Sequence, residues 1–317
     1  MPHNALTTLL PSLHNQRQLC LIGAAVIDIV TEAAALPVRG GDLEVTEKGL
    51  HIGGCALNIA IALKRLEIDS LNALPIGQGN WASLISRSLE QNGITSEIQT
   101  DKGDNGWCMA LVEPDGERTF ISVSGVENHW DEDILNSLPL ADDALIYLSG
   151  YQLASPSGEQ LVAWLESLPD TVDAFVDFGP RIADIPDTLF QRLLALKPIV
   201  SLNRQEAEVL GMGCAETFTR QWFKENQCPL ILRIDSDGAL FADANQTGNV
   251  SPFPATVVDT IGAGDSHAGG VLAGLASGWE LPDAVLLGNA VASFVVSHRG
   301  GDCAPDRQAL ADYLSRY

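Results

Sequence analysis

The chain has 317 residues, a length that fits one large α/β domain or two smaller ones. Its net charge is −23, with 41 acidic against 18 basic residues, which argues against binding to nucleic acids or anionic membranes because both require basic patches. An anionic small molecule such as ATP is not excluded, because backbone dipoles, one or two arginines and bound Mg²⁺ can hold phosphates on an acidic protein.

The cysteines and the N-terminus bear on the cellular compartment. Six cysteines are scattered along the chain and none forms a C-x-x-C pair, so no zinc site is predicted. Cys20 and Cys55 have apolar or small neighbours, as buried free thiols do, which indicates a reduced, cytoplasmic compartment. No signal peptide is expected, and the longest apolar stretch, residues 19–30, is too short to span a membrane.

The first half of the chain predicts strands separated by glycines, two helices and a β-hairpin. Residues 18–30 are expected to form a first strand buried on both sides, and residues 43–52 alternate enough for edge strands. Gly53-Gly54 then breaks the chain. The further expected elements are helices at 56–66 and 81–92, a core strand at 71–76, and hairpin strands at 107–112 and 118–123.

From residue 143 onward, strands and helices alternate, which is typical of a parallel sheet covered by helices on both faces. The expected strands are 144–148, 174–177, 199–202, 230–234, 238–242 and 257–258, and the expected helices are 158–168, 189–195, 205–210, 266–277 and 282–297. We therefore predict a single α/β domain over residues 1–317, with a doubly wound, mostly parallel sheet. A small β-sheet inserted from about 31–52 and 104–124 accompanies it.

Polar residues near the first strand and the glycine break are candidates for binding a sugar. Asp28 is expected at the carboxyl edge of the sheet, where open α/β sheets bind ligands, and its carboxylate can accept bonds from two vicinal hydroxyls. Gly53 and Gly54 permit close approach of a ligand to the backbone, and the amide of Asn58 can donate to and accept from hydroxyls. The structural alternatives are a capping role for Asp28 and a turn-forming role for Asn58.

Residues 201–206 run from a strand end into a helix. Asn203 is a plausible N-cap and Glu206 lies three positions later, which as pure structure is a capping box. Functionally, the same two side chains could hold phosphate oxygens and water-coordinated Mg²⁺. Both interpretations remain open at this point.

The segment Asp259-Thr260-Ile261-Gly262-Ala263-Gly264-Asp265 precedes a small-residue helical pattern. Its glycines and alanine let backbone N–H groups point outward at the positive end of a helix, which makes an anion hole. Asp265 follows at once and presents a carboxylate beside the bound anion, the arrangement that phosphoryl transfer to a hydroxyl requires. The structural alternative is a simple turn with a capping aspartate.

These three motifs, in this order and spacing, resemble the ribokinase-like, PfkB-type carbohydrate kinase family over roughly residues 18–310. The resemblance implies that Asp265 is the general base and that Gly262, Ala263 and Gly264 form the anion hole. It implies sugar-binding roles for Asp28, Gly53, Gly54 and Asn58. It places Asn203 near the phosphates and Glu206 at a water-mediated Mg²⁺ site.

The same resemblance implies the remaining contacts and partners. Asn289 corresponds to a nucleotide-proximal position, and Asp259 with the loop around Gly300 corresponds to a monovalent-cation site often filled by K⁺. Arg233 and Gly238 flank the family's glycine-rich turn near the adenine, although Asp235 stands where glycine is common. The inserted sheet resembles the family's lid, which covers the sugar and often mediates formation of a homodimer. His267 stands where many relatives have an aromatic residue, so either packing or tuning of Asp265 is open.

We therefore expect an ATP- and Mg²⁺-dependent kinase that phosphorylates a hydroxyl of a sugar or sugar-like molecule. A nucleoside such as adenosine, inosine or pseudouridine is the alternative acceptor, with Trp107 either stacking on a base or packing within the lid. Arg181 is a candidate phosphate contact or a surface ion-pair partner. Because the lid segments offer only Arg39, Lys48 and Arg118, a sugar phosphate is less favoured. A non-catalytic sensor on the same fold is the rival from another class.

Overall fold

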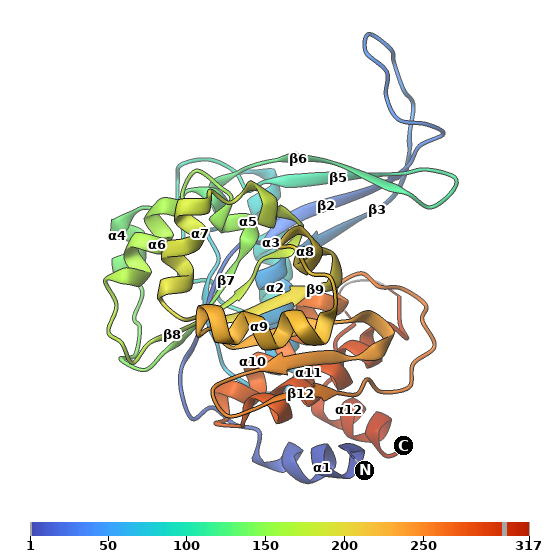
Figure 1. The fold of residues 1–317 in the computed structure, drawn as a ribbon. Helices are drawn as coiled ribbons and strands as arrows, with labels where there is room; N and C mark the ends of the chain where they lie inside the picture. Colours follow the sequence, from blue (N-terminus) through green and yellow to red (C-terminus); the bar gives the residue numbers. More distant parts are fainter. Residues whose placement is uncertain (1, 300–302, 317) are drawn as a thin grey trace.

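The computed structural model describes residues 2–299 and 303–316, which form two β-sheets and the helices around them (Figure 1). The strands of the larger sheet are β1 Leu19–Ile22, β4 Leu71–Ala73, β7 Leu145–Ser149, β8 Asp173–Asp177, β9 Ile199–Asn203, β10 Leu230–Arg233, β11 Ala239–Ala242 and β12 Thr247–Val250. Their order is β12-β11-β10-β9-β8-β7-β1-β4, and all neighbours from β10 to β4 pair in parallel. Strands β11 and β12 pair antiparallel at one edge. The predicted doubly wound, mostly parallel sheet is confirmed.

Alternate residues of the central strands enter two separate cores, one on each face of the sheet. Leu19 and Leu21 of β1 belong to one core, and Cys20 and Ile22 belong to the other. The first core is covered by α1 Pro2–Leu9, α2 Cys55–Arg65, α3 Asn80–Gln91, α10 Ala263–Ala276, α11 Leu281–Val295 and α12 Arg307–Leu314. The second is covered by α4 Glu132–Asn136, α6 Gly158–Glu166, α7 Asp187–Ala195 and α9 Ala215–Asn226.

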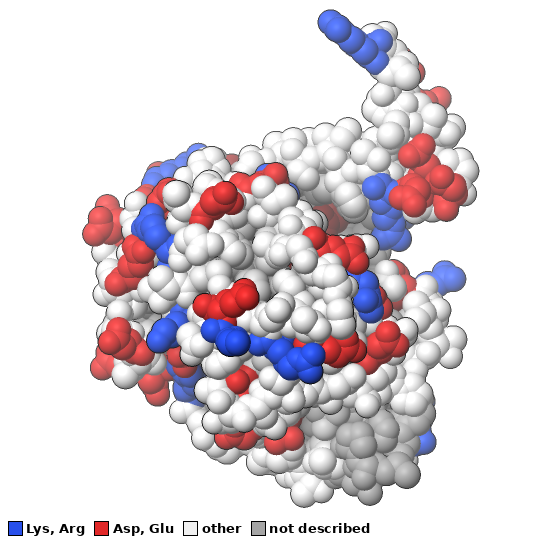
Figure 2. Space-filling model, viewed as in Figure 1, with Lys and Arg blue, Asp and Glu red and all other residues white. Residues whose placement is uncertain are grey.

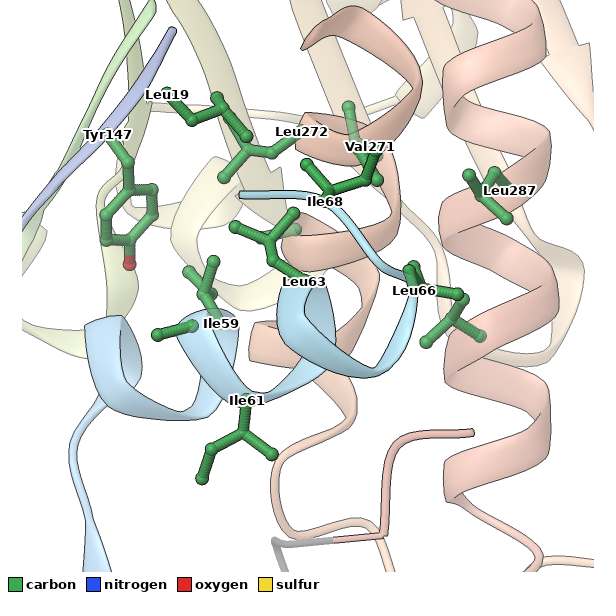
Figure 3. Packing of buried hydrophobic residues seen from close by; sticks show 14 of the residues in the cluster. Leu19, Ile59, Ile61, Leu63, Leu66, Ile68, Tyr147, Val271, Leu272 and Leu287 are labelled. Atoms are coloured by element: carbon green, nitrogen blue, oxygen red, sulfur yellow. The ribbon is translucent and has the colours of Figure 1, made fainter. Parts of the chain in front are cut away.

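The helices α2, α10 and α11 pack closely because their facing residues are small or branched. Figure 3 shows Ile59 and Leu63 of α2 beside Val271 and Leu272 of α10. Where α10 crosses α11, a Cβ added at Gly270 would lie 2.8 Å from the Cα of Gly288, so backbone meets backbone there. This contact fixes the direction of α10, whose first turn carries Asp265.

The smaller sheet consists of β2 Val26–Glu32, β3 Thr46–Gly53, β5 Trp107–Val112 and β6 Arg118–Val123, in the order β3-β2-β5-β6. It lies over the upper end of the larger sheet, and the loop between β2 and β3 projects beyond it (Figure 1). We call this sheet the lid. Its β2 strand begins at Val26, earlier than the boundary expected near residue 31.

The two faces of the lid differ in character because side chains alternate along each strand. Asp28 is in register with His51 of β3 and Cys108 of β5, and Cys108 is in register with Ser122 of β6, so these four share one face. Trp107 lies on the opposite face with Ile27 and packs against the first core. This contact favours a packing role for Trp107, against the first core and not within the lid, while stacking on a nucleoside base stays an untested alternative.

Two of the expected strands differ in the structure. Residues 18–30 do not form one strand, because Gly23, Ala24 and Ala25 separate β1 of the larger sheet from β2 of the lid. Asp28 consequently lies in the lid, and the expectation that it sits at the carboxyl edge of the main sheet is wrong. Residues 257–258 lie in an irregular segment that follows Pro252 and Pro254, and the side chains of Val257 and Val258 are exposed. The Val258 N–H donates to the Val296 carbonyl at 2.7 Å, just after α11, so it does not pair with a strand.

None of the helices within residues 2–299 and 303–316 has the length and apolar character needed to cross a bilayer.

Replacing Gly270 by alanine should destabilise the fold even though alanine favours helices. The added Cβ meets the backbone of Gly288, which cannot move cheaply, so the free energy of unfolding should fall by about 1–3 kcal/mol. Chemical denaturation measures it. Gly213→Ala is the matched control, since no atom lies within 4 Å of its added Cβ. Equal stability of Gly270→Ala and the parent protein would contradict the packing argument.

Candidate active site

Polar residues end three adjacent strands at the carboxyl edge of the main sheet. Asp177 is the last residue of β8, Asn203 of β9 and Arg233 of β10, and parallel strands bring such residues to one edge. Arg233 Nη2 lies 2.9 Å from Asp177 Oδ1 and 3.7 Å from Glu206 Oε2. The guanidinium thus connects three segments that are far apart in the sequence.

The Arg233–Asp177 pair is largely shielded from solvent, with side chains 15% and 10% exposed. Burial raises the pKa of Asp177 above its usual range, and the guanidinium beside it opposes that shift. The Nε of Arg233 is buried and has no hydrogen-bond partner among the described residues. A buried donor without a partner is costly, so this side chain has donor capacity left for a ligand.

The start of α8 Arg204–Val209 has the geometry of a capping box. Asn203 Oδ1 accepts from the Glu206 N–H at 2.8 Å, and Glu206 Oε2 accepts from the Asn203 N–H at 2.9 Å. Asn203 Nδ2 also donates to Glu206 Oε1 at 2.6 Å. The structural interpretation is therefore correct, while the phosphate and Mg²⁺ roles of these two residues stay predictions.

The predicted anion hole lies where α10 begins. Gly262 adopts φ +73°, a left-handed conformation that favours glycine, and α10 starts at Ala263. The Ala263 N–H is used by the Thr260 carbonyl at 3.3 Å, so the N–H groups that follow, of Gly264 and Asp265, are the first-turn donors available to an anion. A Cβ at Gly264 would lie 2.7 Å from Arg233 Nη1, which places the guanidinium directly against this turn.

The carboxylate of Asp265 is held from the side of α2. Asn58 Nδ2 donates to Asp265 Oδ2 at 2.7 Å, and the Cys55 thiol also hydrogen-bonds this carboxylate. Burial raises the pKa of Asp265, whereas the two hydrogen bonds and the Arg233 guanidinium oppose that rise. Burial and the neighbouring Asp265 raise the pKa of the Cys55 thiol well above its usual value, so Cys55 stays protonated and can donate.

Asp28 reaches the same place from the lid. A Cβ at Gly53 would collide with Asp28 Oδ2, and one at Gly54, where φ is +108°, would collide with the Ala24 carbonyl. These glycines therefore allow the lid strands to meet the start of α2. Burial raises the pKa of Asp28 to about 6, with His51 opposing the shift and Asp265 adding to it.

The residues expected near the nucleotide lie next to α10. Asn289 is buried, and its amide donates to the carbonyls of Val250 and Ser251 and pairs with His267 Nε2 at 3.1 Å. Burial lowers the pKa of His267 to about 3, so its ring is neutral, and its buried position favours the packing role. Nucleotide contact by Asn289 stays a prediction.

Asp235 stands where the family commonly has glycine, and its backbone conformation explains how the turn accommodates it. Asp235 adopts φ +57°, the left-handed conformation that glycine usually supplies, and Arg204 Nε lies 3.1 Å from its carboxylate. Gly238, at φ +90°, abuts the carbonyl of Val250. The turn is thus kept although its glycine is replaced.

Two further expectations concern Arg181, as a phosphate contact or a surface ion-pair partner, and Asp259, as part of a monovalent-cation site. Arg181 forms an ion pair with Asp184, in agreement with the surface role. Asp259 accepts from the Ile261 N–H at 3.1 Å, but Gly300 lies outside the described residues. Within residues 2–299 and 303–316 no three His, Cys, Asp or Glu side chains converge as a ready metal site.

Three residues near the site were given no site role from the sequence. Asp177 begins a segment, residues 177–181, that resembles a strand-end motif of the family, but only Arg181 was considered as a contact. The thiol of Cys55 was treated only as a buried group, although it begins the helix that carries Asn58. Tyr151, in the short helix α5 Gly150–Leu153 that follows β7, carries no motif that marks it.

Comparisons with known proteins agree with this geometry. Residues 16–307 match the pfkB family carbohydrate kinases. The chain is 57% identical over 310 residues to the "Uncharacterized sugar kinase YegV" of Escherichia coli (strain K12), covering 96% of each chain.

Two solved structures share the fold at low identity. The ribokinase of Thermotoga maritima superimposes with a TM-score of 0.80 at 20% identity, covering 94% of this chain and 99% of that one. A nucleoside kinase of Burkholderia thailandensis in complex with inosine gives a TM-score of 0.74 at 19% identity, covering 94% and 97%. The chain belongs to the pfkB family of carbohydrate kinases, enzymes that transfer a phosphoryl group to an alcohol.

Proposed function

We propose that this protein is an ATP-dependent kinase that phosphorylates a hydroxyl of a small sugar-like molecule, with Asp265 as the general base. The observation that carries the proposal is the position of Asp265, one residue after the Gly262-Ala263-Gly264 turn and within 2.7 Å of Asn58 Nδ2. One carboxylate is thus next to an anion-binding helix start and next to the face that the lid covers. Such a carboxylate can accept the proton of a hydroxyl as it attacks a phosphoryl group.

The charge that develops on the transferred phosphoryl group requires fixed donors. The first-turn N–H groups of α10 provide them at the positive end of a 14-residue helix. Arg233 packs against this turn, because its Nη1 is next to Gly264 and its Nη2 is held by Asp177. Arg233 therefore serves the phosphate side of the site in this proposal, together with Gly238 and Asn289.

The carboxylates of Asp177 and Glu206, at the carboxyl edge of the main sheet, are suited to a cation that accompanies the nucleotide. Mg²⁺ usually binds through one or two carboxylates, several waters and substrate phosphates, so a preformed cage of three side chains is not required. Glu206 is the proposed carboxylate, through water, and Asn203 orients it by the capping box. When bound, Mg²⁺ would neutralise phosphate charge. Asp259 is the proposed ligand for a monovalent cation such as K⁺.

The lid supplies the acceptor side. Asp28, Gly53, Gly54 and Asn58 lie where the lid meets α2, and closure over the acceptor would exclude water from the transfer. The lid face opposite Asp28 packs against the first core at Ile27 and Trp107, and the same face carries the exposed apolar side chains of Leu50, Ile121 and Val123. These residues support a homodimer formed through the lid.

Asp265→Asn should lower kcat by at least ~100-fold, because the amide cannot accept the hydroxyl proton. ATP affinity should remain close to that of the parent enzyme, since the α10 N–H groups are unchanged. Steady-state kinetics and calorimetric ATP titration measure the two effects. Asp170→Asn, an exposed position on a turn remote from the site, serves as the control. Near-normal turnover of Asp265→Asn would remove Asp265 from the role of base.

Cys55→Ala should shift the acid limb of the kcat/KM pH profile upward by roughly half to one pH unit. Asp265 must be ionised to act as the base. Loss of the Cys55 donor raises the pKa of Asp265, so on acidification the variant loses activity at a higher pH than the parent enzyme. Cys55→Ser retains a donor and should keep the parent limb. The pKa of Asp28 is also raised, but Asp28 is present in all three proteins, so the difference between them reports on Asp265. Identical limbs in the three proteins would count against this contact.

A further inference from the structure

We propose that His267 is a positioning residue for Arg233. A buried water accepts a hydrogen bond from Arg233 Nε and donates one to His267 Nδ1, and this link fixes the plane of the guanidinium beside the first turn of α10. The inference rests on the proposed function, because it assigns His267 a task on the phosphate side of that site. Its starting point is three buried polar atoms with no hydrogen-bond partner within residues 2–299 and 303–316, namely Arg233 Nε, His267 Nδ1 and Ser201 Oγ.

The three side chains face one space between the larger sheet and α10. Ser201 of β9 is in register with Ile231 of β10, so the two share a face, and Ile231 belongs to the first core. Arg233 follows Ile231 by two positions and lies on that same face. His267 follows Gly264 by three positions in α10, which puts both on one side of the helix, and Arg233 Nη1 lies against Gly264. The unpartnered atoms thus belong to the facing sides of one interface.

The Nε of Arg233 is shielded from the solvent that serves the surface cations. Over the face shown in Figure 2, Lys and Arg side chains lie among acidic ones at the exterior, where water can accept from their N–H groups. The side chain of Arg233 is only 15% exposed, and its Nε is buried. Asp177 holds Nη2 at 2.9 Å. Nε is therefore the guanidinium donor that a water inside the protein would satisfy.

The hydrogen bonds of Asn289 determine which nitrogen of His267 carries the proton. Asn289 Nδ2 donates to the carbonyls of Val250 at 2.9 Å and Ser251 at 3.1 Å, so its Oδ1 is the atom that lies 3.1 Å from His267 Nε2. An amide oxygen only accepts, so Nε2 must be the protonated nitrogen. Burial lowers the pKa of His267 to about 3, and the Arg233 guanidinium adds to that shift. The ring is thus neutral, and its Nδ1 is an acceptor.

The Nδ1 edge of the ring is turned away from α11. A Cβ added at Gly288 of α11 would lie 3.1 Å from His267 Cδ2, so the Cδ2 edge faces that helix. Nδ1 is bonded to the other side of Cγ and therefore lies on the opposite edge. His267 is 3% exposed, so solvent outside the protein does not serve this acceptor.

A single water satisfies these atoms with the correct donors and acceptors. The Nε–H of Arg233 is a donor, the Nδ1 of neutral His267 is an acceptor, and the Ser201 hydroxyl can be either. A buried water usually makes about three hydrogen bonds to polar groups that lack a protein partner, and leaving such groups unpaired is costly. The link requires the Nε2–H form of His267, which Asn289 selects.

The water link controls the orientation of the guanidinium. A planar group held at one nitrogen can turn about that contact, whereas contacts at Nη2 and Nε together define its plane. Asp177 supplies the first contact and His267, through water, the second. The plane determines how Nη1 meets the α10 turn at Gly264, whose N–H groups are proposed to bind the transferred phosphoryl group. His267 therefore acts on the reaction through Arg233, and no contact with substrate is required.

Two substitutions at His267 separate its two hydrogen bonds. His267→Gln can keep a donor near the position of Nε2 and removes the acceptor at Nδ1, whereas His267→Asn keeps an acceptor near Nδ1 and removes the donor to Asn289. We expect kcat to fall by about 5- to 20-fold in His267→Gln and by less than ~3-fold in His267→Asn, with the KM of the acceptor within ~2-fold of the parent value in both. Steady-state kinetics measures this split.

A packing role predicts a different result. If His267 only fills space, the smaller asparagine should be the more damaging substitution, because it leaves the larger cavity. Equal kcat in the two variants, or a lower kcat in His267→Asn, would therefore overturn the inference. Urea denaturation checks that both variants are folded at the assay temperature. His14→Gln, at an exposed position in the N-terminal segment, is the control that should match the parent enzyme.

The coupling to Arg233 has its own test. In Arg233→Lys the side chain keeps a positive charge but has no Nε–H, so the water link is already lost. Adding His267→Gln to this variant should then change kcat by less than ~2-fold, a departure from additivity that a double-mutant cycle measures. The same fall in both backgrounds would show that His267 acts independently of Arg233, which contradicts the inference.

A structural measurement decides the inference even without turnover. A high-resolution crystal structure of the parent protein should contain a water within hydrogen-bond distance of both Arg233 Nε and His267 Nδ1, and ¹⁵N NMR should report the Nε2–H tautomer with Nδ1 as an acceptor. Absence of this water, or the Nδ1–H tautomer, would overturn the inference and leave the kinase proposal intact. An inactive parent enzyme that contains the water would count against the proposed function alone.

Discussion

The ion pair between Arg233 and Asp177 is the interaction on which the rest of the site depends. It joins the ends of β8 and β10 across β9, lies 3.7 Å from Glu206, and presses against the turn that starts α10. Removing one partner from such a pair leaves an uncompensated buried charge, which costs about 3–5 kcal/mol. The guanidinium therefore stabilises a group of carboxylates that would otherwise repel one another, and it fixes the helix start at which a phosphoryl group can be bound.

A second constraint is the crossing of the chain between the two sheets. The break at Gly23–Ala25 carries the chain from β1 into the lid, and Gly53-Gly54 carries it back to α2. Because Gly54 lies against the backbone of Ala24, these two crossings touch, and Asp28, Cys55 and Asn58 meet near Asp265. The lid is thus anchored at the catalytic end and extends away from it (Figure 1). Movement of the lid about these glycines would open the acceptor side without disturbing the strand ends.

The sequence predicted the alternation of strands and helices and the hairpin at 107–123, because these depend on local pattern. The family resemblance, carried by ordered motifs, implied that residues 58 and 265 belong to one site. The sequence did not predict that residues 18–30 divide between two sheets, since a buried apolar run looks the same in one strand as in two. The face on which Trp107 lies follows from pairing register, which only the partner strand Val26–Glu32 reveals. The hydrogen bond from Cys55 depends on a contact between two helices distant in sequence, for which no local signal exists.

The central proposal is that phosphoryl transfer takes place between the first turn of α10 and the carboxylate of Asp265, with Arg233 packed against the turn. A crystal structure with ADP, Mg²⁺, aluminium fluoride and an acceptor that the enzyme turns over tests this placement most directly, because the planar fluoride mimics the transferring group. The fluoride should accept from the Gly264 and Asp265 N–H groups, and the reacting hydroxyl should lie within hydrogen-bond distance of Asp265. A fluoride bound away from this turn, or a hydroxyl out of reach of Asp265, would contradict it.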